Sequence, residues 1–145
     1  MQNASVTETR IAYGVVALGA AFAAAVSGWN AYFLGNFLFM WGPPAALCVL
    51  LLALRARPAM MAGASLATTV HLALFCLWVS TLPAREGAMT WIGYVFALPG
   101  GGCAALLAAA SVDQKRSYLQ AVLLSFGITL AGFSIGQALV WGVLL

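Results

Sequence analysis

The sequence is poor in charged residues. Only 6% of its 145 residues are Asp, Glu, Lys or Arg, whereas soluble domains average about a quarter. A soluble fold of this length needs a polar outer surface, and too few charged side chains are present to form one. The 64% of hydrophobic residues therefore indicates that lipid, rather than water, surrounds most of the chain.

Potential metal ligands are also scarce. Cys48, Cys76 and Cys103 lie inside apolar runs without a CxxC spacing, and His71 is the single histidine. This pattern favours neither disulfides nor a zinc site. Haem ligation would need a second ligand from a partner chain. We therefore expect no metal and no cofactor.

Groups that could carry catalysis are missing as well. The three carboxylates, Glu8, Glu86 and Asp113, lie at or beyond the ends of the apolar runs, which argues against a proton-coupled antiporter of the small multidrug type. Ser65 and His71 are out of phase on one predicted helix, so they cannot pair as nucleophile and base. We expect the protein not to be an enzyme.

Apolar runs are what the sequence has in abundance. Five of them, each near the ~20 residues that cross a bilayer, are separated by short polar breaks. The predicted spans are 10–29, 34–54, 59–82, 88–112 and 118–143. No break is long enough for a soluble domain, so residues 1–145 are predicted to be one transmembrane domain, an all-α bundle of five helices.

The boundary between the first two spans is the least distinct. Gly, Asn and aromatic residues alternate from Ser27 to Gly42 without a clear break. This segment is either a tight outer hairpin or a single bent unit. A count of four spans would worsen the distribution of basic residues, so we retain five.

Basic residues predict the orientation, because they remain on the cytoplasmic side of a membrane. With the N-terminus inside, only Arg85 of the six Lys and Arg residues is outside. The cytoplasmic residues are Arg10, Arg55, Arg57, Lys115 and Arg116. All five tryptophans then fall in the outer half, where their rings favour the headgroup region. The prediction is a cytoplasmic N-terminus and a periplasmic or extracellular C-terminus.

Composition indicates the host and limits the partners. Abundant Ala, Gly and Leu, with more Arg than Lys, are typical of a bacterium with a GC-rich genome, so we expect a bacterial inner membrane. The basic residues are scattered between apolar runs, which predicts no binding of nucleic acid. The expected partners are the lipid bilayer and either another membrane protein or a second copy of the chain.

Two stripes of small residues predict close helix packing, which in lipid depends on small side chains. The first helix has Gly14, Ala17, Ala21, Ala24 and Gly28 at helical spacing. The last helix has Ser125, Thr129, Gly132 and Gly136, ending in GxxxG. Either both stripes pack within one chain, or one of them faces a partner.

Irregular and polar residues share one predicted depth at the middle of the membrane. They are Pro43, Pro44, Thr68, His71, Pro99, Gly100, Gly101 and Gly102. Proline frees the carbonyl four residues earlier, so a broken fourth helix is predicted near Pro99–Gly102. We expect His71 to donate to a carbonyl freed by proline and Thr68 to hold its other nitrogen. A buried spacer and a binding site both fit His71.

Two functions of different class fit these features. The favoured one is a non-enzymatic protein that acts through helix–helix contacts, as an accessory subunit of a membrane complex or as an immunity protein against a membrane-acting toxin. The alternative is a homo-oligomeric channel or transporter for a small neutral or anionic solute, with its site at the broken fourth helix.

Overall fold

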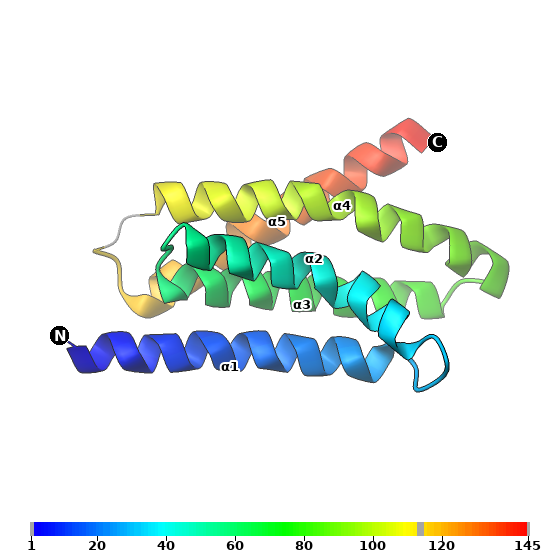
Figure 1. Ribbon diagram of the computed structural model, residues 1–145. Helices are drawn as coiled ribbons and strands as arrows, with labels where there is room; N and C mark the ends of the chain where they lie inside the picture. The colour runs from blue at the N-terminus through cyan, green and yellow to red at the C-terminus, as the bar shows by residue number, and fades with distance from the viewer. Residues whose placement is uncertain (1, 113–114, 145) are drawn as a thin grey trace.

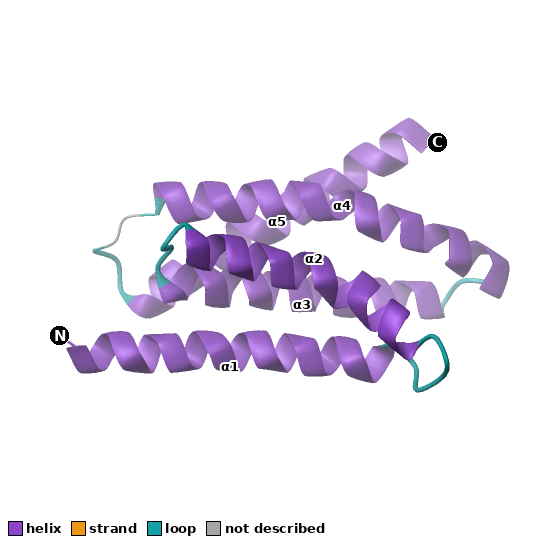
Figure 2. Ribbon diagram, in the orientation of Figure 1, coloured by secondary structure: helices purple, strands orange, loops and turns teal. Residues whose placement is uncertain are grey.

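The computed structural model describes residues 2–112 and 115–144, which form five helices joined by short turns (Figures 1 and 2). The helices are α1 (Gln2–Val26), α2 (Phe33–Ala53), α3 (Pro58–Ser80), α4 (Ala84–Ser111) and α5 (Tyr118–Leu144). Each includes a segment long and apolar enough to cross a membrane. The all-helical class and the count of five are confirmed for the described ranges, which contain no strand. Asp113 lies outside them.

The first helix and the turn after it differ in detail from the predicted span. α1 begins at Gln2, well before residue 10, because a helix can continue beyond the apolar residues that mark a membrane span. It ends at Val26, and Gly28 then adopts a left-handed φ of 73°, the usual conformation just past a helix end. The Asn36 side chain donates to the Ser27 carbonyl at 3.0 Å. Segment 27–42 is therefore a tight turn followed by the start of α2.

The second turn uses an arginine where glycine is usual. Arg55 adopts a left-handed φ of 54° just past α2. Its backbone N–H donates to the Leu52 carbonyl, and that of Ala56 donates to the Leu51 carbonyl, both at 2.9 Å. This pair of bonds is the Schellman arrangement that satisfies the last carbonyls of a helix. The chain then enters α3 with Pro58 at the first helical position, where its missing N–H costs nothing.

α3 is the centre of the bundle. It contacts each of the other four helices, and α4 and α5 pack closely against each other on one side of it. In an 18-residue apolar window of α3, 56% of the residues are buried, whereas the corresponding value for α1 is 17%. α1 is therefore a peripheral helix that leaves most of its surface uncovered by the rest of the chain.

The two termini lie at opposite ends of the bundle, as an odd number of alternating helices requires (Figure 1). At the N-terminal end, Arg57 joins three segments. One of its guanidinium nitrogens donates to the Glu8 carboxylate at 3.0 Å and another donates to the Arg116 carbonyl at 2.7 Å. The Tyr118 hydroxyl donates to the Glu8 carbonyl at 3.4 Å. The turns that carry most of the basic residues are thus tied together at one end.

The predicted break in the fourth helix is wrong. α4 is one continuous helix from Ala84 to Ser111 with Pro99 inside it. A single proline removes one backbone hydrogen bond, and a helix can absorb this loss by bending. The ribbon of α4 curves along its length in Figure 1.

Glycines let α4 and α5 cross at very short range. A Cβ atom placed on Gly100 would lie 2.5 Å from the Gly132 carbonyl oxygen and 3.2 Å from the Gly136 Cα. A Cβ on Gly132 would lie 2.5 Å from the Gly100 carbonyl oxygen and would overlap Ala104. Gly100 and Gly101 of the triplet therefore serve helix packing rather than helix breaking, since a Cβ on Gly101 would overlap the Phe133 ring. The small-residue stripe of α5 is buried against this crossing and against α3.

Gly132→Ala should lower the thermal unfolding midpoint of the detergent-solubilised protein, because the added methyl group forces the two backbones apart. Gly127→Ala on the same helix is the matched control, since a Cβ there meets nothing within 4 Å. Replacing an open helical glycine by alanine is neutral or stabilising by about 0.5–1 kcal/mol. Equal midpoints for the two variants would show that the crossing is not close.

Candidate functional site

Tyr94 satisfies one of the backbone carbonyls that the prolines of α2 release. Pro44 removes the N–H that would bond to the Met40 carbonyl. The Tyr94 hydroxyl of α4 donates to this carbonyl at 3.2 Å, and the Tyr94 side chain is fully buried. The expected donor was His71, so this assignment is corrected. The longer phenol side chain reaches α2 from α4, whereas the imidazole remains between α4 and α5.

His71 is held by aromatic stacking rather than by hydrogen bonds. Its ring is nearly parallel to that of Phe133, with centroids 4.5 Å apart, and to that of Tyr94, with centroids 5.6 Å apart. Its Nε2 atom is buried and finds no hydrogen-bond partner among the described residues. Thr68 does not hold the ring, because its hydroxyl donates to the Ala64 carbonyl at 2.8 Å.

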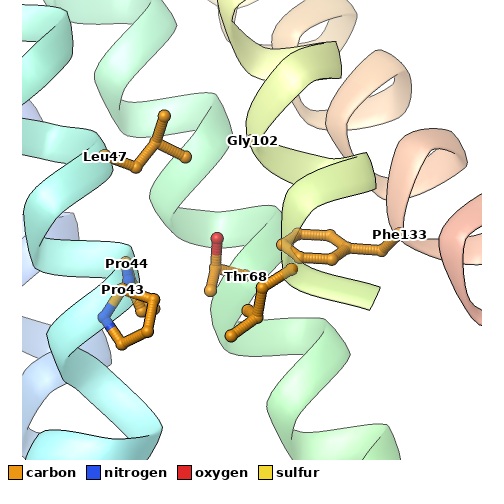
Figure 3. Close-up of a pocket in the computed structure, with 7 residues that line it drawn as sticks. Pro43, Pro44, Leu47, Thr68, Gly102 and Phe133 are labelled. Atoms are coloured by element: carbon orange, nitrogen blue, oxygen red, sulfur yellow. The ribbon is translucent and has the colours of Figure 1, made fainter. Parts of the chain in front are cut away.

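Part of the predicted midplane set meets around a small cavity of about 50 Å³ (Figure 3). Its lining residues are Pro43, Pro44, Leu47, Thr68, Leu98, Gly102 and Phe133. Figure 3 shows Thr68 between the two prolines on α2 and Phe133 on α5. A space of this size accommodates water but not a larger solute. The lining is mostly apolar, with the Thr68 hydroxyl as its one side-chain polar group.

The remaining midplane residues lie elsewhere. Pro99 is exposed on the surface of α4. Gly100 packs against α5, and a Cβ on Gly101 would overlap the Phe133 ring. Phe133 thus lies between the small cavity and His71, since it contacts both. The residues predicted to share one depth therefore lie in two separate environments, one on each side of the Phe133 ring.

A groove on the other side of Phe133 contains the least satisfied polar groups of the described chain. It has a volume of about 170 Å³. Its lining residues are His71, Leu74, Phe75, Trp78 and Gln137. Both polar atoms of the Gln137 side chain are buried and have no partner among the described residues, as is the case for His71 Nε2. A buried polar atom left unpaired costs about 1–3 kcal/mol, so this concentration needs an explanation.

Sequence reasoning missed Tyr94, Phe133 and Gln137. Gln137 could have been recognised in the sequence, because it is a polar side chain inside the last apolar run. Tyr94 and Phe133 could not, since aromatic residues are common throughout the chain and only tertiary contacts distinguish these two. No group of three or more His, Cys, Asp or Glu residues that could hold a metal ion occurs in the part of the chain described.

A larger pocket of about 340 Å³ lies near the turn between α1 and α2. Its lining residues are Val26, Ser27, Asn36, Phe39, Met40 and Trp91. The Ser27 hydroxyl donates to the Ala23 carbonyl at 2.6 Å, and Asn36 donates to the Ser27 carbonyl. The Ser27 hydroxyl and the Asn36 amide nitrogen are therefore already engaged in holding the turn.

The two small-residue stripes have different environments. The residues of the α5 stripe are all buried, and the Ser125 hydroxyl donates to the Met60 carbonyl at 2.9 Å. In the α1 stripe, Gly14, Ala17 and Ala21 are exposed. α1 packs instead through the opposite face. A Cβ on Gly19, at the centre of that face, would overlap the Trp41 ring.

Tyr94→Phe should lower the thermal unfolding midpoint, because it leaves the buried Met40 carbonyl without its donor at a cost of about 1–3 kcal/mol. Tyr13→Phe on the exposed side of α1 is the control and should leave the midpoint unchanged. If both variants unfold like the wild type, the hydrogen bond from α4 to α2 contributes nothing to stability.

The comparisons with known proteins give no relative. No protein-family model, curated protein or solved structure matches this chain.

Proposed function

We propose that this chain is a non-enzymatic protein of the bacterial inner membrane that acts through helix–helix contacts with another membrane protein. It serves as an accessory subunit of a membrane complex or as an immunity protein against a membrane-acting toxin. The N-terminus lies in the cytoplasm and the C-terminus lies outside. The contact surface is the face of α1 defined by Gly14, Ala17 and Ala21, called the α1 face below.

The observation that carries this proposal is the unused small-residue face of α1. Small side chains allow two backbones to approach closely, and this approach is a main source of helix association in lipid. The α5 stripe illustrates the effect within the chain, since it packs against α4 and α3. The α1 face has the same kind of residues but is exposed among the described residues, and a Cβ added to Gly14 meets nothing within 4 Å.

A homo-oligomeric channel or transporter is the less favoured alternative. Its predicted site was a break in the fourth helix, and α4 is continuous through Pro99. The midplane cavity of about 50 Å³ is also small for a solute pathway within one subunit. Such a function would depend on a path formed between subunits.

The proposed orientation is supported by the grouping of basic residues at the N-terminal end of the bundle. A C-terminal fusion of alkaline phosphatase, which is active only outside the cytoplasm, should be active. The same enzyme fused after Arg57 should be inactive. This result is expected because the membrane potential retains basic turns on the cytoplasmic side. The reverse pattern would contradict the proposed orientation.

The contact surface can be tested with two glycine variants that differ only in their helix. Gly14→Leu places a bulky side chain on the α1 face, and Gly127→Leu places one in equally open space on α5. We expect the wild type and Gly127→Leu to co-purify with a second membrane protein in mild detergent. Gly14→Leu should lose this partner, because its side chain prevents close approach.

Mass measurement of the native particle decides between the candidate functions. A particle containing one other membrane protein supports the proposal. A particle of identical subunits would instead favour the channel. A uniform monomer, with unchanged complex assembly and toxin tolerance after gene deletion, would contradict helix-contact function.

A further inference from the structure

The groove lined by His71, Leu74, Phe75, Trp78 and Gln137, called the α3–α5 groove below, is open along one side of the bundle. Leu74 and Trp78 at its edge are 57% and 39% exposed. Both residues belong to an apolar span of α3. In a bilayer, Leu74 at this edge faces the hydrocarbon and Trp78 lies nearer the headgroups, so a molecule can enter the groove from the lipid phase.

Two residues that line the groove have between them three buried polar atoms without partners in the described structure. They are His71 Nε2 and the side-chain nitrogen and oxygen of Gln137. Gln137 offers one acceptor and two donor hydrogens, and a neutral imidazole nitrogen either donates or accepts. Hydrocarbon can satisfy none of these atoms. A molecule that satisfies the hydrogen-bonding capacity of these atoms must both donate and accept hydrogen bonds.

Both polar side chains lie beside neighbouring helices. The His71 ring is stacked against Phe133 and Tyr94, which limits its rotation. The Gln137 amide lies beside Gly93, where a Cβ atom would be 3.2 Å from the amide nitrogen. Stacking therefore fixes the orientation of the His71 ring before a ligand binds, which lowers the entropic cost of binding.

The walls of the groove favour an uncharged aromatic ring. Leu74, Phe75 and Trp78 are apolar or aromatic, and none of the lining residues carries a permanent charge. The volume of about 170 Å³ suits a single ring, since protein cavities of about 150 Å³ accept benzene. Phe75 and Trp78 already pack edge to face with centroids 5.8 Å apart, and they offer ring surfaces to a bound aromatic group.

We propose that the α3–α5 groove binds a neutral aromatic alcohol, a phenol or quinol, that enters from the lipid phase. The hydroxyl group of the ligand donates to the Gln137 oxygen and accepts from the Gln137 nitrogen or from His71. Its ring packs against Phe75 and Trp78. This site lies on α3 and α5, so it is separate from the α1 face and does not depend on the proposed partner.

Binding can be measured by fluorine NMR at neutral pH on the full chain in phosphatidylcholine nanodiscs. The probe is para-trifluoromethylphenol, and its methyl ether, para-trifluoromethylanisole, is the matched compound without a donor. Protein-free nanodiscs report partitioning into lipid. We expect saturable binding of the phenol to the wild type, with the ether bound about fivefold more weakly, as the loss of one hydrogen bond predicts.

Gln137→Leu and His71→Phe remove the polar atoms while keeping similar shapes. Gln137→Leu should abolish the preference for the phenol over its ether, and His71→Phe should reduce it. Gln120→Leu is the control, because Gln120 is exposed at the other end of α5. A general disturbance of folding would weaken the binding of both compounds together. The ratio of their affinities therefore reports the contribution of the hydrogen bonds.

Three results would overturn the proposal. One is a signal identical to that of protein-free nanodiscs, which would mean that only water or lipid occupies the groove. Another is equal binding of phenol and ether by the wild type. The third is a preference for the phenol that both groove variants retain.

Discussion

The close approach of Gly100 on α4 to Gly132 on α5 determines much of the arrangement at the middle of the bundle. Because neither residue has a side chain, the two backbones come within a distance that a Cβ atom would prevent. At the next position along each helix, Phe133 covers Gly101 and stacks on His71. Further along α5, Gln137 lies against Gly93. The environments of His71 and Gln137 therefore depend on the crossing.

Most polar side chains at this depth form hydrogen bonds with backbone carbonyls. A carbonyl freed by proline cannot be left facing lipid, and the Tyr94 hydroxyl satisfies that of Met40. The serine and threonine hydroxyls of α3 and α5 mostly bond to carbonyls of the bundle, as Thr68 and Ser125 do. The His71 Nε2 atom and both polar atoms of the Gln137 side chain form no such hydrogen bond in the described structure. The Thr129 hydroxyl, in the packing stripe of α5, is likewise buried without a partner in the described structure.

The helices differ in how much of their surface the chain itself covers. α3 is central, whereas α1 is held mainly by one face and by the Arg57 contacts at its N-terminal end. A helix with one buried face and an exposed face of small residues is suited to contact a second protein in the membrane. The two proposed surfaces, one for a protein and one for a small molecule, thus lie on different helices.

The sequence by itself determined the five apolar helices, their approximate ends and the grouping of basic residues, because these depend on composition and length along the chain. It also indicated Pro43, Pro44, Thr68 and Gly102, which share a depth and meet at one cavity. Only the tertiary structure decided that Tyr94 rather than His71 donates to the carbonyl freed by proline. It also decided that α4 continues through Pro99 and that Gln137 lines the same groove as His71. The physical reason is that both faces of a helix in lipid are apolar. Hydrophobicity therefore does not mark the inward face, which depends on the crossing and register of neighbouring helices.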